Sequence, residues 1–378
     1  MIPLAIPNLS GREAAYLQEC ITSGFVSSVG PFVDRFEQAT ASATGSTGAV
    51  ATASGTAGLH LALTVVGVRP GDLVIVPSFT FIASANAIAQ CGAVPWLFDI
   101  SDESWTLDPA QLERELSASV DLVDGVATHR PSGRHVAAVM PVYAMGTPAD
   151  MDPIVSAARA RGIPVVADAA AAIGARYRGR NLGGCADVSV ASFNGNKTLT
   201  CGGGGALFGN DLPLLARARH LSTTARVGPG YDHDEVGFNY RLTNIQAAVG
   251  CAQFEQLDQF LARKASVFEH YSDLARQIPG ASAFPSPHWA PSAHWFSGIV
   301  LDDADRAGAL LDGLRQRGVD ARPFWKPVHL QAPFRDAPAA SLAHADGLWR
   351  RVVALPSSTS ITDDDLGVVS RAVLDALA

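Results

Sequence analysis

Short apolar runs alternate along this chain with longer stretches in which apolar residues recur at helical spacing. The continuous apolar runs predict buried strands, and they lie at 49–52, 73–76, 94–98, 136–142, 163–168 and 188–193. Helices are predicted over 10–43 (interrupted at Gly24 and Gly30), from about 58 to Gly67, and over 80–91 and 153–161. Buried strands that alternate with helices are typical of a parallel, doubly wound sheet covered on both faces. The predicted fold class is α/β.

The pattern changes after residue 244. A long, kinked helix is predicted over 244–278, and it is followed by a strand at 296–301, a helix at 304–317, a short strand at 320–322 and a helix at 362–377. Earlier in the chain, the polar segment 119–135 is expected to be a surface excursion. A chain of 378 residues is too long for one ordinary core. We expect a large domain over 1–250 and a small C-terminal domain over 251–378.

Composition narrows the class of protein and of partner. Hydrophobic residues make up 48% of the chain and charged residues 17%, which indicates a well-packed globular enzyme. The net charge of −8 disfavours nucleic acid and anionic membranes as partners. The five cysteines are scattered, without disulfide or metal-ligand spacing, which favours a reducing cytoplasm and no metal. The N-terminus does not resemble a signal peptide, and no apolar run reaches the ~20 residues of a membrane span.

Lys197 is the most informative residue for chemistry. It is one of only three lysines, and it lies between the end of an apolar strand and the glycines 202–205. A primary amine can form a Schiff base with a carbonyl cofactor. Asp168 closes an earlier apolar strand, and this order suggests the two poles of a pyridoxal phosphate (PLP) site, with the carboxylate on the pyridinium nitrogen. A solvated loop lysine and an N-capping aspartate are the competing interpretations.

Segment 54–58, with the sequence Ser-Gly-Thr-Ala-Gly, lies between a predicted strand and a predicted helix. Its glycines would let the backbone approach a phosphate, and the helix N-terminus would supply free N–H groups. A helix N-cap by Ser54 with two closely packed glycines explains the segment equally well. The sequence alone leaves both interpretations open.

Other residues near strand ends could complete such a site. Ser192, Asn194 and Asn196 are short polar groups that could bind a phosphate or a sugar hydroxyl. Phe81 follows a strand end and could stack on a pyridine ring, although core packing is the commoner role of a Phe and Phe79 competes for this one.

Taken together, these segments resemble the DegT-type sugar aminotransferases, PLP enzymes of the aspartate-aminotransferase fold. The similarity spans nearly the whole chain, and its motifs lie at 24–30, 54–60, 77–83, 148–152, 168–170, 192–197, 233–241 and 322–329. The resemblance implies fold type I, with a mostly parallel seven-stranded sheet between helices in the large domain and a smaller α+β domain after it. The Asn-Gly-Asn-Lys form of 194–197 looks most like the branch that aminates C4 of UDP-linked 4-keto-6-deoxy-N-acetylhexosamines.

The resemblance also implies roles for individual residues. Lys197 would hold PLP as a Schiff base and move protons, Asp168 would bind the pyridinium nitrogen, and Phe81 would stack on the ring. The amino donor would be L-glutamate and the acceptor a nucleotide-linked keto sugar.

The cofactor's phosphate would be shared between two subunits. Gly55, Thr56 and Ser192 would bind it from one subunit, and Asn239 would reach it from the neighbouring one. The resemblance therefore implies a homodimer with shared active sites.

Two positions depart from the family pattern, and three further functions compete with C4 amination of a UDP-linked sugar. Family members commonly carry Gln or Glu at the position of Ala171 and often His in the segment that ends at Tyr143. Two of the competing functions are C3 or C4 amination of a dTDP- or GDP-linked keto sugar, and a catalytically silent regulator that binds PLP or a sugar nucleotide. A nicotinamide-dependent dehydrogenase is disfavoured, because no Gly-x-Gly-x-x-Gly motif follows the first strand.

Overall fold

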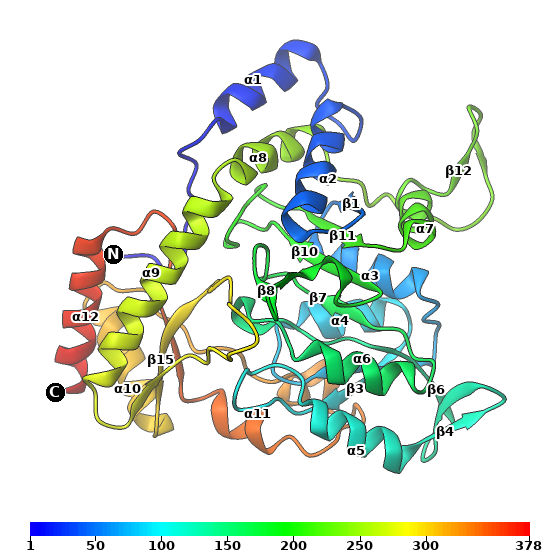
Figure 1. The fold of residues 1–378 in the computed structure, drawn as a ribbon. Helices are drawn as coiled ribbons and strands as arrows, with labels where there is room; N and C mark the ends of the chain where they lie inside the picture. Colours follow the sequence, from blue (N-terminus) through cyan, green and yellow to red (C-terminus); the bar gives the residue numbers. More distant parts are fainter.

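The computed structural model describes residues 1–378, and Figure 1 shows their arrangement. Its α-helices are α1 (Glu13–Ser23), α2 (Pro31–Thr44), α3 (Gly55–Val65), α4 (Ala83–Gln90), α5 (Pro109–Ser119), α6 (Met151–Arg159), α7 (Leu212–Ser222), α8 (Asn244–Phe254), α9 (Leu257–Arg276), α10 (Ala304–Gln316), α11 (Ala343–Leu348) and α12 (Asp363–Leu377). The strands that build its three larger sheets are β1 (Gly48–Thr52), β2 (Leu73–Pro77), β3 (Val94–Phe98), β4 (Val120–Val123), β5 (Val126–His129), β6 (Arg134–Val139), β7 (Val166–Asp168), β10 (Val188–Ser192), β11 (Gly205–Gly209), β14 (Ala281–Ala283), β15 (Ser297–Leu301) and β16 (Val352–Leu355).

The α/β class is confirmed, but the single seven-stranded, mostly parallel sheet is not. The strands form a four-stranded sheet in the order β1-β11-β10-β7 and a five-stranded sheet in the order β3-β2-β6-β5-β4, and both are mixed. Only the isolated parallel bridges Val139–Val165 and Val142–Asp168 join β6 to β7. Pro141 and Pro164 lie in these paired segments and have no N–H to donate, so the ladder between the sheets is interrupted.

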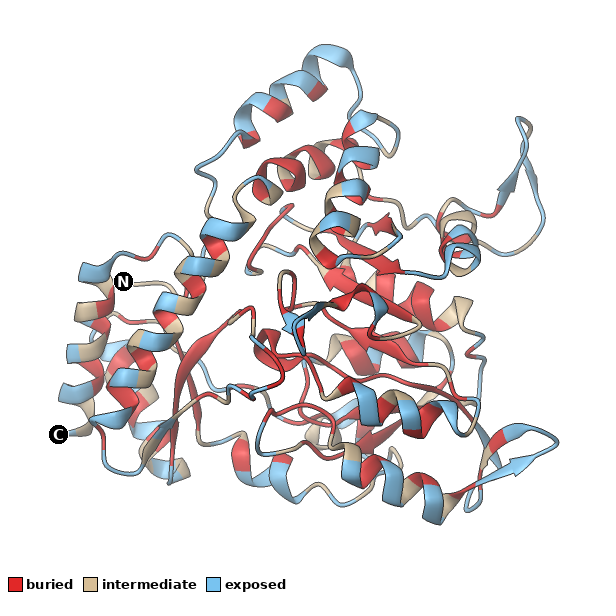
Figure 2. Cartoon of the chain, in the orientation of Figure 1, coloured by how far each residue is buried: buried red, intermediate tan, exposed pale blue.

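Alternation along the strands divides their side chains between two cores. Ala49, Ala51 and Ile75 pack with α2, α5, α6 and α8 on one face, whereas Val50 and Val74 pack with α3, α4 and α7 on the other. Figure 2 shows the buried residues concentrated on the strands and on the inner faces of the helices. This packing fixes the positions of the carboxyl ends of β2, β7 and β10 relative to one another.

The C-terminal part has a core of its own. The antiparallel sheet β14-β15-β16 packs against α9, α10 and α12. The N-terminal residues join it, because Ile2 pairs with Val319 and Leu4 accepts a hydrogen bond from the backbone N–H of Ser357.

Three local predictions can be compared with these elements. The kink in the helix over 244–278 is confirmed, because α8 ends at Phe254 and α9 begins at Leu257. The strand predicted at 320–322 is not formed as a strand: Val319, just before it, and Arg322, at its end, each make only a single isolated bridge. The segment 119–135 is largely exposed, as expected, but it forms the β4–β5 hairpin, whose turn contains Asp124 at a φ of 52°.

The two smallest sheets are hairpins, β8 (Arg176–Tyr177) with β9 (Arg180–Asn181) and β12 (Arg226–Val227) with β13 (Asp232–His233). The β12–β13 hairpin projects from the body of the molecule beyond α7 (Figure 1). None of the helices combines the length and the hydrophobicity that a membrane span requires.

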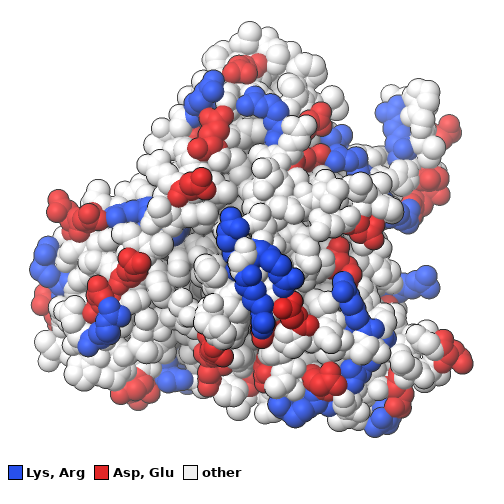
Figure 3. All heavy atoms as spheres, viewed as in Figure 1, with Lys and Arg blue, Asp and Glu red and all other residues white.

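Charged side chains of both signs are interspersed over the face drawn in Figure 3. The net charge of −8 is therefore not gathered into one acidic patch on this face.

Candidate active site

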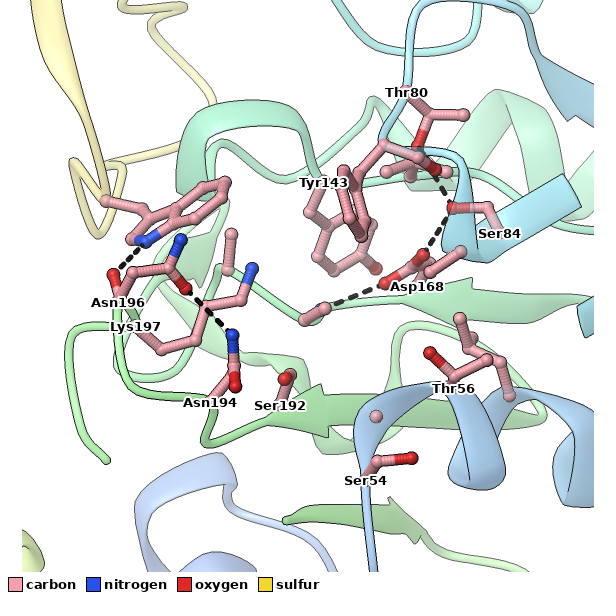
Figure 4. A pocket seen from close by; sticks show the side chains of 18 of the residues that line it. Ser54, Thr56, Thr80, Ser84, Tyr143, Asp168, Ser192, Asn194, Asn196 and Lys197 are labelled. Carbon is pink, nitrogen blue, oxygen red and sulfur yellow. Dashed lines mark hydrogen bonds between the residues drawn. The ribbon is translucent and has the colours of Figure 1, made fainter. Parts of the chain in front are cut away.

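A cavity of about 370 Å³ lies where the ends of β2, β7 and β10 meet the N-terminus of α3 and aromatic residues from the C-terminal part (Figure 4). Volumes in this range are typical of small-molecule sites. Its lining contains Gly55, Thr56, Phe81, Asp168, Ser192, Asn194, Asn196 and Lys197, together with Trp295, Phe324 and Trp325. Folding therefore gathers every site residue predicted from sequence except Asn239.

Lys197 enters the cavity from the turn after β10. Its backbone N–H donates to the carbonyl oxygen of Asn194 at 3.0 Å, which closes the turn. Burial disfavours the charged amine and lowers its pKa from 10.5 to about 8, while the nearby Asp168 carboxylate acts in the opposite direction. About a tenth of this amine is therefore neutral, and nucleophilic, at pH 7.

Asp168 lies at the end of β7 and is only 4% exposed. Its Oδ2 accepts a hydrogen bond from Ser84 Oγ at 2.7 Å, and its Oδ1 accepts one from the Ala170 N–H at 3.1 Å. Burial raises the pKa of Asp168, whereas Ser84, Ala170 and Lys197 each oppose that rise. The site thus holds a buried carboxylate that an additional cation would stabilise.

The N-terminus of α3 forms the lower wall of the cavity (Figure 4). Ser54 caps the helix, because its Oγ accepts a hydrogen bond from the Ala57 N–H at 3.0 Å. A Cβ on Gly55 would lie 2.8 Å from the Ser192 Cβ, so only glycine lets α3 and β10 approach this closely. The capping interpretation is confirmed, and the same geometry presents free N–H groups to an anion.

Phe81 and Phe79 have different surroundings. Phe81 is 57% exposed and lines the cavity, whereas Phe79 is fully buried and packs against Trp105 and Trp325. Asn239 is exposed, pairs with Thr223, and does not line the cavity of its own chain.

Several lining residues were not identified from sequence. Trp295 places its ring centroid 3.5 Å from Lys197 Nζ and donates from Nε1 to the Asn196 carbonyl oxygen at 2.6 Å. Ser84 is the hydrogen-bond partner of Asp168. Nothing local to 295 or 84 indicates either role, because both depend on contacts between distant segments. Trp325, which lies within the motif at 322–329, carried the clearest signal.

The residues at the two departures also border the cavity. Ala171 presents only a methyl group to it. Tyr143 is 1% exposed, and its hydroxyl has no hydrogen-bond partner in the protein.

The family model of the DegT/DnrJ/EryC1/StrS aminotransferases matches residues 7–374. The chain belongs to this family. It is therefore a PLP-dependent aminotransferase of the nucleotide-sugar class, and its family implies a keto sugar and an amino donor as substrates.

Individual relatives match over almost the full length. The chain is 37% identical over 380 residues to EpsN of Bacillus subtilis, named for a PLP-dependent aminotransferase activity, covering 99% of this chain and 95% of EpsN. It is 36% identical over 383 residues to the GDP-perosamine synthase of Caulobacter vibrioides, covering 98% and 97%. The solved structure of the aminotransferase TlmJ from Streptoalloteichus hindustanus matches with a TM-score of 0.90 at 28% identity, covering 100% of this chain and 99% of TlmJ.

The cavity fits the cofactor that the family requires. Its donor set combines an amine of lowered pKa, a buried carboxylate and a helix N-terminus whose Gly55 leaves no room for a side chain. These groups match an aldehyde, a pyridinium nitrogen and a phosphate, respectively. Lys197, Asp168 and the segment 54–56 are thus suited to hold PLP.

Proposed function

We propose that this aminotransferase moves the amino group of L-glutamate to C4 of a UDP-linked 4-keto-6-deoxy-N-acetylhexosamine. The observation that carries the proposal is the cavity in which the Lys197 amine, with its pKa near 8, lies close enough to the buried Asp168 for their charges to interact. The Asn-Gly-Asn-Lys sequence of 194–197 supports the UDP-linked acceptor, because it resembles the lysine motif of that branch.

The roles of this chain's residues follow from their positions. PLP, when bound, supplies a carbonyl for amine exchange and an electron sink for the carbanion at the donor's α-carbon. Lys197 Nζ would hold the cofactor between turnovers and, once released, would take the proton from the donor's α-carbon and deliver it to the cofactor carbon that bears the nitrogen, with the reverse transfer for the acceptor sugar. Asp168 keeps the ring nitrogen protonated, and Ser84 keeps Asp168 ionised.

The remaining lining residues would bind the phosphate and ring of the cofactor and exclude water from the amine. The α3 N-terminus, Thr56 and Ser192 would bind the phosphate, and Phe81 would stack on the ring. Trp295 and Trp325 bring large apolar surfaces to the opposite wall and keep water from the amine.

A GDP-linked 4-keto-6-deoxyhexose is the second candidate acceptor. It is favoured by the matches to GDP-perosamine synthases, at 36% identity for the Caulobacter vibrioides protein and 32% for that of Escherichia coli O157:H7. The intact pair of Lys197 and Asp168 weighs against a catalytically silent binder.

The proposal is tested by the absorption spectrum of the PLP-loaded protein before and after L-glutamate, followed by assays with UDP-, GDP- and dTDP-linked 4-keto sugars. We expect the visible cofactor band to fade with glutamate and to return with the UDP-linked acceptor. Return with the GDP-linked sugar alone would replace the first acceptor by the second. A band that never responds to glutamate would contradict the donor.

Lys197→Ala tests the residue assignment. This variant should lose the band of covalently held PLP and its turnover should fall by several orders of magnitude, because no other amine is found in the lining of the cavity. Full turnover in Lys197→Ala would contradict the proposed role.

A further inference from the structure

A second lysine, Lys264, is buried behind the cavity and has no part in the chemistry proposed above. It lies on α9 and is only 3% exposed. Its Nζ donates to the backbone carbonyl oxygens of Trp295, at 2.7 Å, and Ser357. A neutral amine has two N–H groups, and here both find acceptors, whereas the third N–H of an ammonium would have none among these contacts.

The surroundings of Lys264 favour the neutral amine. Burial alone lowers its pKa from 10.5 to about 7, and no carboxylate acts on it. The titratable neighbour is His294, whose own pKa is lowered to about 4 by burial and by Lys264. A buried amine without a counter-charge is costly to keep, which suggests that its two hydrogen bonds serve a purpose.

Trp295 connects Lys264 to the cavity. Its carbonyl oxygen binds Lys264, its N–H donates to the Met145 carbonyl oxygen at 2.9 Å, and its Nε1 donates to the Asn196 carbonyl oxygen. Figure 4 draws the last of these bonds as the dashed line from an indole nitrogen to the carbonyl oxygen of Asn196. The indole held in this way has its ring centroid 3.5 Å from Lys197 Nζ.

We propose that Lys264 is a positioning residue that acts through Trp295: it fixes the Trp295 backbone so that the indole covers the Lys197 amine and keeps water from it. This inference rests on the proposed role of Lys197 in holding the cofactor. It assigns a function in the active site to a helix of the C-terminal part, which contributes no side chain to the cavity lining.

The interactions of Lys197 determine in which direction its pKa should change when the indole is released. The ring and Asp168 both favour the ammonium, yet burial outweighs them and lowers the pKa to about 8. Releasing the indole would admit water and raise the pKa toward its ordinary value. Each unit of rise leaves about tenfold less neutral amine at a fixed pH below the pKa, and so slows the reaction of the amine with an aldehyde about tenfold.

The test measures how fast the cofactor-free protein captures PLP, from the growth of the visible band, between pH 6.5 and 9.5 (about three units around the pKa of Lys197). Lys264→Met should move the inflection of the plot of capture rate against pH upward by about one pH unit, and it should slow capture at pH 7 about tenfold. The Gln side chain is one atom shorter than Lys and cannot reach both carbonyl oxygens, so Lys264→Gln should shift the inflection in the same direction. This variant replaces Lys264→Met if Lys264→Met does not fold.

Tyr271→Phe is the matched control, because it removes another buried hydrogen bond of α9, from Tyr271 Oη to the Pro356 carbonyl oxygen at 2.7 Å. It should lower the unfolding midpoint without moving the inflection. Trp295→Phe should also move the inflection. The double variant that combines Trp295→Phe with Lys264→Met should show no further shift.

The outcomes separate the inference from the proposed function. An inflection that stays in place in Lys264→Met, or shifts that add fully in the double variant, would overturn the positioning role. Retention of the band in Lys197→Ala would instead overturn the role of Lys197 itself.

Discussion

Asp168 shows how few atoms set the protonation of the site. Its carboxylate is buried at the end of β7, and two donors, Ser84 Oγ and the Ala170 N–H, oppose the rise in pKa that burial causes. Thr80 Oγ1 lies 3.0 Å from Ser84 Oγ and extends the network. A single hydroxyl therefore contributes to keeping the carboxylate charged.

Ser84→Ala should raise the pKa of Asp168 further, since the lost bond is one that lowers it. Hydrogen bonds to charged groups contribute about 1.5–3 kcal/mol, so the acid limb of the kcat profile should move to higher pH by about one to two units. Ser104→Ala, which breaks a buried hydroxyl pair with Thr106 at 2.7 Å, is the matched control. Coincident acid limbs for Ser84→Ala and the parent would remove Ser84 from this role.

At the scale of elements, the position of the α3 N-terminus, for which we propose phosphate binding, depends on the close approach of α3 to β10 and β11. A Cβ on Gly205 would lie 2.7 Å from Gly55 N and from the carbonyl of Ser54, and these are backbone atoms that cannot rotate away. Gly205 on β11 does not line the cavity, but it lets the N-terminus of α3 approach the sheet, and we propose that this N-terminus binds the phosphate.

Gly205→Ala should destabilise the protein by about 1–3 kcal/mol and weaken PLP binding at least tenfold, because the α3 N-terminus must move. Gly308→Ala on α10, where a Cβ meets nothing within 4 Å, should stabilise by about 0.5–1 kcal/mol instead. Urea unfolding and PLP titration measure both quantities. Unchanged PLP affinity in Gly205→Ala would show that the wall tolerates displacement.

At the scale of the whole molecule, the buried Lys264 and the partly buried Lys197 make stability depend on pH. Lys264 has a folded pKa of about 7, and unfolding restores it toward 10.5. Between these values the unfolded chain binds more protons, so the free energy of unfolding rises with pH. Lys197 adds to this slope from about pH 8 upward.

The free energy of unfolding of the cofactor-free protein should therefore increase between pH 7 and 9 by up to about 1.4 kcal/mol per unit for each lysine. Lys264→Met should remove the contribution of Lys264 and give a flatter curve. Urea unfolding at pH 7, 8 and 9 measures the slopes (the two-unit window follows from the pKa shifts). Parallel curves for the two proteins would mean that Lys264 is charged in the folded state.

The proposed homodimer with shared sites also belongs to this scale. Asn239 is exposed and remote from the lining of its own cavity, as expected for a residue that serves a neighbouring subunit. Mixed dimers of Lys197→Ala and Asn239→Ala subunits would each contain one site with both wild-type residues. We expect mixing to restore activity that neither variant has alone, measured after exchange of subunits. No recovery in dimers shown to be mixed would place Asn239 outside the partner's site.

The division into domains at residue 250 stays a prediction. It falls within α8, and α9 follows directly, so this helical pair connects the sheets to the C-terminal core without an irregular linker. The N-terminal residues 2–4 pack on that C-terminal core.

Local chemistry was sufficient to predict much of this protein. Apolar periodicity predicted the strand that ends at Asp168 and the strand that precedes Lys197, and the rarity of lysine together with the glycines at 202–205 identified the amine. Glycine and serine at 54–58 marked the helix N-terminus. These features are encoded within a few neighbouring residues, so they can be recognised without knowing what packs against them.

Only the tertiary structure decided which distant groups act on those residues. Ser84 reaches Asp168 across 84 positions, and Trp295 reaches the Lys197 turn across 99. The division into two mixed sheets and the burial of Lys264 against backbone carbonyls likewise depend on contacts between segments far apart in the chain. Burial and long-range hydrogen bonding set the pKa of each group, and neither leaves a local pattern in the sequence.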